Sequence, residues 1–407
     1  MTFLNAWKPV ASFTMSKTNM LWYPLRLRSP ARSLLFRALL GGADERRGMS
    51  SSAKAGSEGV AIRDTLLRVH LPFKTNPGLF ADYANIYGGV RMGKILEDLD
   101  AIAAAVAFMV LEKAKDPEVK DTNVTMVTAA VDHIDIDAQH KLITNSDVAD
   151  LRLSAVATFS SHSSLEVSIY VEKHENGDKY TQIARANFIM VSRTLDGGKR
   201  PPHPLPALTA DTREEKALLE DGIKRNLARK AKRENSLEVS PPTAQESAQI
   251  HALLKNNNNK LANRKPSETV MQTTRLCQPQ ERNIHGRIFG GYLMREAFEL
   301  AVSTALLHQR SPLEIMAIDD IAFVAPVEVG SILNLQARIV FTDTNCLQVR
   351  VQADVIETTS EEKRRTTNVF FFTFVPAASA NSVVRPVLPE TYQEAMDWLQ
   401  AQRRILP

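Results

Sequence analysis

The sequence predicts an α+β protein made of two copies of one unit. A glycine-punctuated motif occurs twice, 198 residues apart. In each copy the motif leads into one long apolar helix, and several strand-like segments follow. One long helix packed on an antiparallel sheet is an α+β layer arrangement. The chain of 407 residues has room for two such units, because a domain typically has about 150 residues.

The repeat keeps its order along the chain. Asn85 matches Asn283 at an offset of 198. Later matches fall at offsets of 187, 182 and 181, the last between Asn187 and Asn368. Changes in loop length account for this drift, and we therefore interpret the pattern as an internal duplication.

The elements of each copy follow from local patterns. A short strand is expected over 66–71 and over 269–276, ahead of the glycine motif. A long helix should then run over about 93–111 and 291–308, because apolar residues recur three and four positions apart. Four strands should follow in each copy, with hairpin signals such as residues 175–178 between them.

The regions outside the two copies differ from them in composition. A Gly/Pro-rich stretch, a charged helix-prone stretch and a Pro- and Asn-rich stretch separate the copies, as in a linker. We expect a transit peptide and disordered leader at 1–48, a first domain at 60–195, a charged linker with one helix at 196–264, a second domain at 265–390, and a C-terminal helix or tail at 391–407.

Composition excludes several classes of protein. Apolar residues make up 44% and charged residues 24% of the chain, as in ordinary globular proteins. The two cysteines, Cys277 and Cys346, are too few for a disulfide framework or a Cys-x-x-Cys metal site. No apolar run reaches about 18 residues, so no transmembrane segment is expected. We expect no metal and no cofactor.

The basic balance of the chain belongs to its leader. Residues 1–43 contain six basic residues and no acidic one, and the remaining chain has 44 basic and 46 acidic residues. An acid-free, Arg-containing leader without a compact apolar core is typical of a transit peptide, and the alternative is an untargeted disordered tail. Because Arg dominates the leader, we expect import into the mitochondrion, with the matrix as the destination, rather than into the chloroplast. The near-neutral body predicts no nucleic-acid partner.

One basic cluster stands out in the body, within residues 224–233. It is either a solvated helix face or a surface for an anionic ligand or a nucleic acid.

The second copy of the motif carries a resemblance to a known family. Asn283, Gly286, Phe289-Gly290-Gly291 and Leu293-Met294 resemble the signature of hot-dog-fold acyl-coenzyme A (acyl-CoA) thioesterases. Two such units behind a transit peptide resemble the mitochondrial acyl-CoA thioesterase 9 type, over roughly residues 60–195 and 265–390.

The resemblance implies two tandem hot-dog domains packed side by side, each a long helix wrapped by an antiparallel sheet. It also implies hydrolysis of fatty acyl-CoA to free acid and coenzyme A, in fatty-acid metabolism. A homo-oligomer, a dimer or larger, is the expected assembly.

The resemblance further implies which residues form the site. In this family one hot dog contributes an Asn and the amide-rich start of its helix, and the other contributes an acid about 15 positions after its own Asn. That acid is Asp100 in the first copy, where the second copy has Phe298, with Glu299 one position on. We therefore expect one working site, built from Asp100, Asn283, Gly290 and Gly291. The opposite site, with Asn85 and Phe298 or Glu299, should be weak or dead.

Each of these residues would have a distinct task. Gly291 and Gly290, at a helix start, would donate backbone N–H groups to the oxyanion of the attacked thioester. Asn283 would orient water or polarise the carbonyl. Asp100 would act as a general base or as a nucleophile that forms an anhydride, and the sequence leaves both routes open. Arg287 would contact the phosphates of coenzyme A.

Two other functions remain to be weighed. A hot-dog hydratase would need a His paired with an acid in a different motif, and the sequence has no such pairing. A non-catalytic acyl-CoA sensor or scaffold would keep the fold with a decayed site, and this alternative stays open.

Overall fold

The computed structural model describes residues 11–13, 59–113, 124–137, 148–175, 177–194, 201–234, 236–237, 239–256, 264–283, 286–356, 364–380 and 382–405. Most of the expected leader lies outside these residues. The contacts divide the chain into two compact units, each interrupted in sequence. Unit 1 comprises Met1–Ala84, Lys94–Asp132 and Asp147–Arg225, and unit 2 comprises Asn85–Gly93, His133–Ser146 and Asn226–Pro407.

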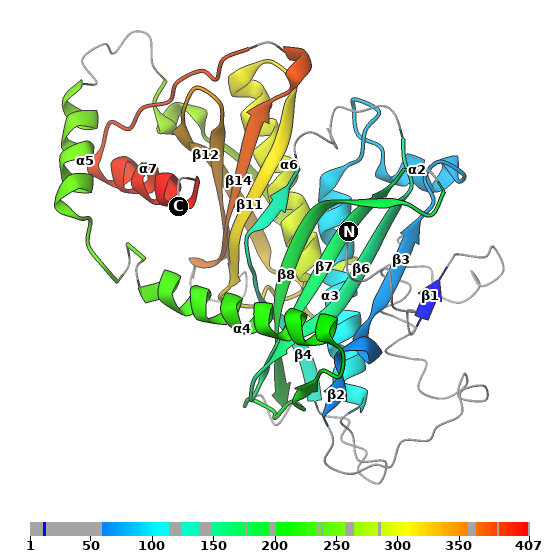
Figure 1. Cartoon of the computed structure of the whole chain (residues 1–407). Coiled ribbons are helices and arrows are strands. Elements are labelled where there is room, and N and C mark those ends of the chain that lie inside the picture. The colour runs from blue at the N-terminus through cyan, green and yellow to red at the C-terminus, as the bar shows by residue number, and fades with distance from the viewer. Residues whose placement is uncertain are drawn as a thin grey trace. The chain divides into compact units, whose positions relative to one another are not determined.

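Unit 1 contains a five-stranded antiparallel sheet (Figure 1). Its strands, in spatial order, are β3 (Leu67–Leu71), β6 (Leu151–Ser160), β7 (Ser164–His174), β8 (Tyr180–Thr194) and β4 (Val124–Val131). The short strand β1 (Ala11–Phe13) pairs in parallel with β3. The hairpin expected at 175–178 joins β7 to β8, with Gly177 in the left-handed region.

The long helix of unit 1 is α3 (Met92–Lys113). Its residues from 101 to 108 are all buried, and a helix that is apolar on every side belongs in a core. The expected helix over 93–111 is confirmed.

Before α3 the chain forms a short helix that the sequence patterns did not predict. Helix α2 (Pro77–Tyr83) begins after Asn76, whose side chain accepts a hydrogen bond from the N–H of Leu79 at 3.1 Å. Pro77 stands at the first helical position, where its missing N–H costs nothing. The aromatic rings of Phe73 and Tyr83 lie 5.0 Å apart and anchor the helix.

Unit 2 repeats the architecture of unit 1. Its strands, in spatial order, are β10 (Met271–Leu276), β12 (Ile332–Thr342), β13 (Leu347–Ile356), β14 (Arg364–Pro376) and β11 (Leu313–Phe323), with β5 (Ile134–Ile136) paired to β11. Helix α6 (Gly290–Gln309) packs against this sheet, as Figure 1 shows beside β11, β14 and β12. The predicted α+β fold, with one long helix and one antiparallel sheet per copy, is confirmed.

The strand register corrects the last match of the sequence repeat. Val167 lies opposite Phe188 in unit 1, and its equivalent Val349 lies opposite Phe372 in unit 2. Phe188 and Phe372 are therefore equivalent, at an offset of 184. The match of Asn187 to Asn368 was wrong, because Asn187 lies opposite Ser168 in unit 1 and the corresponding pair in unit 2 is Arg350 with Phe371. The offset grows from 182 to 184 because the connection between β13 and β14 is two residues longer than the one between β7 and β8.

Each sheet also has a helix that follows its last strands. In unit 1 helix α4 (Arg213–Glu234) begins after Thr212, and in unit 2 helix α7 (Tyr392–Ile405) begins after Thr391. Both starts form the same capping box, in which Glu215 or Glu394 accepts hydrogen bonds from the backbone and the Thr hydroxyl accepts one in return.

The remaining elements are short. The region 196–264, for which one helix was expected, contains α4 and a second helix, α5 (Ala244–Asn256), which packs on α7. The other segments are β2 (Val60–Ala61), β9 (Leu208–Thr209) and the 3₁₀ turns at Ile62–Thr65, Pro266–Thr269, Pro279–Glu281 and Ala378–Ala380.

Candidate functional site

Asn283 organises the loop that leads into α6. Its side-chain oxygen accepts a hydrogen bond from the N–H of Arg287 at 3.1 Å, and its backbone oxygen accepts one from Gly286 at 3.1 Å. Gly286 has a φ of 74°, a conformation that glycine adopts without strain. The oxygen of the Asn283 amide therefore serves the loop.

Gly290 and Gly291 are the first two residues of α6. Phe289 precedes them at the N-cap and makes no side-chain cap hydrogen bond. The first N–H groups of a helix have no partner within the helix and carry the positive end of its dipole. Both glycines thus lie at the positive end of the α6 dipole.

Asp100 lies in the middle of α3 and is only 1% exposed. Its Oδ1 accepts a hydrogen bond from the hydroxyl of Thr128 in β4 at 2.7 Å. Thr128 is not among the residues predicted from the sequence. The repeat held a signal for it, because Thr128 matches Ile315 at the same offset of 187 that matches Val131 to Ile318.

The equivalent positions in unit 2 are apolar. Phe298, the counterpart of Asp100, packs against the rings of Phe372 and Phe374 at centroid distances of 5.4 and 6.1 Å. Ile315, the counterpart of Thr128, is 1% exposed. A carboxylate and a hydroxyl in one copy are therefore replaced by core packing in the other.

Two more carboxylates of α3 are buried beside Asp100. The Nζ of Lys94 donates to Glu97 at 3.2 Å, and the hydroxyl of Tyr83 donates to Asp98 at 2.5 Å. Burying a charge is costly unless it is paired and hydrogen-bonded, so these partners stabilise the two carboxylates inside the fold. Asp98 also connects α2, through Tyr83, to α3.

The first-copy Asn is used within its own loop. Asn85 accepts hydrogen bonds from the N–H groups of Tyr87 and Gly89 at 2.8 and 3.1 Å. Its amide also donates to the backbone oxygen of Val90 at 3.1 Å. These bonds give Asn85 a structural task in the turn.

Glu299, the displaced acid of the second copy, is held in an ion pair. The guanidinium of Arg91 contacts its Oε1 at 2.6 Å from Nη2 and at 2.8 Å from Nε. The space above Gly93 is also filled, since a Cβ at that position would lie 3.0 Å from the Cγ of Arg295 and 3.2 Å from the carboxylate of Glu299. A ligand approaching the backbone at Gly93 would meet these side chains first.

Arg287, the candidate contact for coenzyme A, forms an ion pair with Glu328 at 2.9 Å. Its side chain is one quarter exposed. This pair fastens the motif loop to the turn before β12, and a phosphate would have to compete with Glu328 for the guanidinium.

A charged cluster that the sequence did not predict joins β5 to β11. The two ring nitrogens of His133 contact Asp135 at 2.8 Å and Asp319 at 2.9 Å. Hydrogen bonds to Asp135 and then Asp319 raise the pKa of His133 to about 10. Gln348 donates to the other oxygen of Asp319 at 2.8 Å. A histidine that stays protonated at neutral pH is a structural clamp rather than a base.

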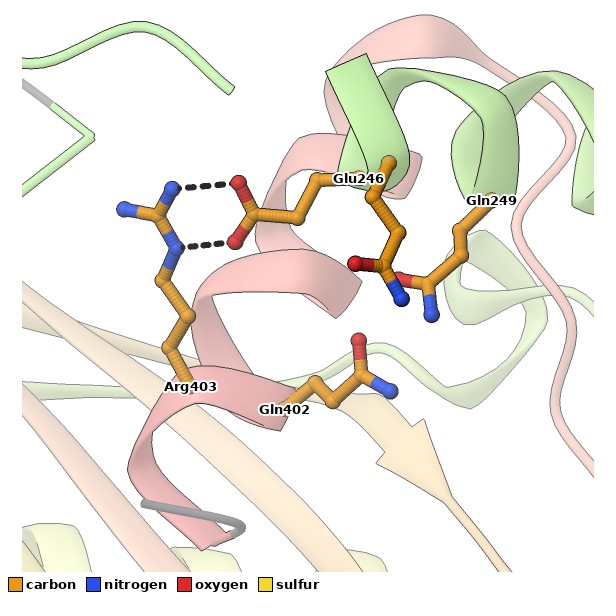
Figure 2. Close-up of a pocket in the computed structure, with 5 residues that line it drawn as sticks. Glu246, Gln249, Gln402 and Arg403 are labelled. Atoms are coloured by element: carbon orange, nitrogen blue, oxygen red, sulfur yellow. Dashed lines mark hydrogen bonds and ion pairs between the residues drawn. The ribbon is translucent and has the colours of Figure 1, made fainter. Parts of the chain in front are cut away.

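Figure 2 shows the side chains that line a hollow between α5 and α7. Its volume is about 210 Å³. Arg403 and Glu246 form two hydrogen bonds across it, at 2.6 and 2.7 Å. Hydrogen bonding to Arg403 lowers the pKa of Glu246 to about 2. None of the predicted site residues lines this hollow, which is bordered by Gln245, Glu246, Gln249, Gln402 and Arg403.

Within the described residues no group of three or more His, Cys, Asp or Glu side chains could hold a metal ion. Among the helices that the structure describes, none is long and apolar enough to cross a membrane.

Comparison with known proteins identifies the family. The chain is 35% identical over 353 residues to the mitochondrial acyl-coenzyme A thioesterase 9 of Mus musculus, and the match covers 84% of this chain and 77% of the mouse protein. It is 34% identical over 374 residues to the Homo sapiens protein of the same name, covering 88% and 82% of the two chains. The chain belongs to the acyl-coenzyme A thioesterase 9 family.

Other comparisons are more distant. A mitochondrial acyl-coenzyme A thioesterase 4 of Humulus lupulus is 31% identical over 333 residues, covering 77% of this chain and 61% of the plant protein. The acyl-CoA hydrolase of Staphylococcus aureus, solved with butyryl coenzyme A, is 27% identical, with a TM-score of 0.33 over 35% of this chain and 87% of that chain. Comparison with models of known protein families gives no match.

Membership of the thioesterase 9 family confirms the predicted resemblance and the predicted acyl-CoA thioester hydrolase. The basic leader and the mitochondrial relatives agree in assigning the chain to mitochondria. The roles of individual site residues stay predictions.

Proposed function

We propose that this thioesterase 9 family member hydrolyses fatty acyl-CoA to free acid and coenzyme A at one site, served by Asp100, Asn283 and the first residues of α6. The observation that carries this proposal is the buried carboxylate of Asp100, which accepts a hydrogen bond from Thr128. A buried carboxylate is costly to keep, and the equivalent positions in unit 2 show that this fold packs well with apolar residues there. A catalytic role for Asp100 would explain why the chain has a carboxylate at this buried position despite its energetic cost.

The reaction needs a nucleophile and a stabilised oxyanion. In one route the carboxylate of Asp100 takes a proton from water as the water oxygen bonds to the thioester carbon. In the other route the carboxylate itself forms that bond, and water later hydrolyses the anhydride. Both routes break the carbon–sulfur bond and release coenzyme A as a thiolate. The thiolate takes its proton from the Asp100 carboxyl in the first route and from water in the second. They remain open alternatives.

The start of α6 supplies the oxyanion site in both routes. The backbone N–H of Gly291, with that of Gly290, would donate to the oxygen that becomes negative. One such donor typically contributes about 3 kcal/mol of transition-state stabilisation. The NH₂ group of Asn283 would polarise the same carbonyl, and Arg287 would exchange Glu328 for a phosphate of coenzyme A.

We propose that the opposite site is weak or inactive. The ion pair between Arg91 and Glu299 neutralises the displaced acid, and the hydrogen bonds of Asn85 serve its own turn. Both observations support a chain in which the two copies have kept complementary parts of one site.

We also propose the finer setting of this activity. The protein would work in the mitochondrial matrix after loss of residues 1–48, as a homo-oligomer of two or more chains. The domain borders at 60–195 and 265–390 remain proposals, and α4 and α7 would extend the two domains because their capped starts are equivalent.

Thiol release from short, long and branched acyl-CoAs tests the proposal. Asp100→Ala should lower kcat at least about 100-fold, since general acid–base groups contribute about 10²–10⁴-fold. Glu299→Ala is the matched control on the other helix and should leave kcat nearly unchanged. If the wild-type protein hydrolyses none of the acyl-CoAs but binds coenzyme A in calorimetry, the chain is the non-catalytic sensor or scaffold and the proposal fails.

A further inference from the structure

Helix α4 carries an apolar stripe on its outer side. Ile223 and Leu227 are 42% and 58% exposed, and Ala231 is exposed one turn further on. Residues spaced by four lie above one another on a helix, so the three side chains form one line. Exposed Ile and Leu side chains are costly in water, and a covering surface would remove that cost.

The opposite side of α4 is anchored to its sheet, which fixes the direction of the stripe. Gly222 touches β6 so closely that a Cβ there would lie 2.2 Å from the backbone oxygen of Thr158. The guanidinium of Arg225 donates to the buried carboxylate of Glu166 at 2.9 Å from Nε and at 2.6 Å from Nη2. The helix therefore lies against the sheet on this side and presents Ile223 and Leu227 away from it.

Basic residues border the stripe. On a helix with 100° per residue, Lys224 falls on one side of the line and Lys230 on the other, and both are exposed. Lys232 and Arg233 follow at the end of the helix, and no acidic residue occurs from 222 to 233. The nearest acids on α4 are Asp221, 3.6 Å from the Nζ of Lys224, and Glu220 and Glu234 at the two ends of the stripe.

We propose that this face of α4 docks on the surface of a bilayer that contains anionic phospholipids. An apolar line flanked by lysines matches a helix lying in the plane of the interface, with its apolar side chains below the headgroups and its ammonium groups among the phosphates. Such docking is reversible and needs no spanning segment. It would bring the enzyme to the surface where long-chain acyl-CoA, an amphiphile, accumulates.

The same residues fit a nucleic acid less well. Single-stranded nucleic acids are bound by basic residues interleaved with aromatic side chains on which bases stack, and α4 contains no aromatic residue. The centre of the exposed face is also apolar rather than basic. The charge and the apolar line together therefore favour a lipid surface.

Sedimentation of the full chain with vesicles tests the proposal. The probes are vesicles of phosphatidylcholine alone and of phosphatidylcholine with about one third phosphatidylglycerol. A basic residue near an anionic surface contributes about fivefold to partitioning, so Lys224→Gln/Lys230→Gln should bind the anionic vesicles about 25-fold more weakly. Ile223→Ser/Leu227→Ser should weaken binding to a similar degree.

The leader provides the matched control, because it carries the same kind of charge. Arg26→Gln/Arg28→Gln removes two basic residues there and should change vesicle binding less than the α4 double variant does. Thermal unfolding and hydrolysis of a short, fully soluble acyl-CoA should be unchanged in both α4 variants, since these side chains are exposed and lie outside the proposed site. This readout separates a failure of docking from a failure of the hydrolase assignment.

Three outcomes would overturn the proposal. The α4 variants could bind anionic vesicles as the wild type does, the wild type could bind both kinds of vesicle equally, or the loss could follow the leader variant instead. Salt-sensitive binding of a single-stranded RNA oligonucleotide, lost in Lys224→Gln/Lys230→Gln while vesicle binding persists, would make this face a nucleic-acid surface.

Discussion

At the scale of single residues, the hydrogen bond between Thr128 and Asp100 is the sharpest difference between the two copies. It places a polar pair where unit 2 has Phe298 and Ile315. A hydroxyl that donates a hydrogen bond to a carboxylate fixes the orientation of the carboxylate plane. We therefore propose that Thr128 is a positioning residue, which acts on the substrate only through Asp100.

Replacing Thr128 with Val removes the hydroxyl and keeps the shape of the side chain. We expect kcat to fall about 10- to 150-fold, while KM changes less than twofold, because one hydrogen bond to a charged group is worth about 1.5–3 kcal/mol. Steady-state thiol release measures both constants. Thr128→Ser should restore most of kcat, and Ile315→Val in the other copy should have no effect. Equal loss in the Ser and Val variants would argue against a positioning role.

At the scale of secondary-structure elements, close packing determines which glycines of a helix can be replaced by alanine. Gly222 in α4 lies against the backbone of β6, whereas a Cβ added to Gly78 in α2 would meet only the side-chain oxygen of Asn76, at 3.6 Å. Alanine normally favours a helix over glycine by up to about 1 kcal/mol. Replacing glycine with alanine should therefore change the free energy of unfolding in opposite directions at the two positions.

Gly222→Ala should lower the free energy of unfolding by about 1–3 kcal/mol, because its methyl group would overlap the backbone of Thr158. Gly78→Ala should raise it by about 0.4–1 kcal/mol, by restricting the unfolded chain. Urea unfolding followed by circular dichroism measures both. A stabilising Gly222→Ala would show that α4 moves away from the sheet at no cost.

The hydrogen bonds of His133 to Asp135 and Asp319 should make the free energy of unfolding depend on pH. The folded pKa of His133, about 10, lies above the ordinary value of about 6.5 for an unfolded chain. The stabilisation is therefore fully present below about pH 6.5 and is lost as the pH rises toward 10. Urea midpoints measured from pH 6 to pH 10 should fall more steeply for the wild type than for His133→Gln. Parallel curves would mean that His133 is not protonated in the folded protein.

At the scale of the whole molecule, two copies of one fold are proposed to share a single working site. Duplication allows each copy to lose what the other supplies, so Asp100 persists in one and the Gly290-Gly291 start of a helix in the other. Once complementary losses have occurred, neither copy would function without its counterpart.

Calorimetry with a thioether analogue of a fatty acyl-CoA, which cannot be hydrolysed, tests this asymmetry. We expect one analogue bound per chain, because the ion pair of Arg91 with Glu299 and the filled space above Gly93 oppose binding at the second position. Arg91→Ala/Glu299→Ala removes that pair and serves as the comparison. Two analogues bound per wild-type chain would contradict the single site.

The sequence by itself determined the repeat, the two long helices and the family. Helical spacing and glycine motifs are local signals, and they located α3 and α6 to within about two residues. Helix α5 was not predicted, although it also has a local signal. Thr243 and Glu246 form a capping box at its start, directly after two prolines. The candidate residues Asp100, Asn283 and Gly291 came from the resemblance to the thioesterase family, transferred to this chain through the register of the repeat.

Only the tertiary structure decided which side chains meet. Thr128 donates to Asp100 across 28 positions of sequence, and Arg91 pairs with Glu299 across 208. Strand pairing makes Phe371, rather than Asn368, the counterpart of Asn187, because the connection before β14 is two residues longer than the one before β8. Local patterns report what a segment prefers, while contacts between distant segments depend on how sheets pair and helices pack, and these interactions arise only when the whole chain folds.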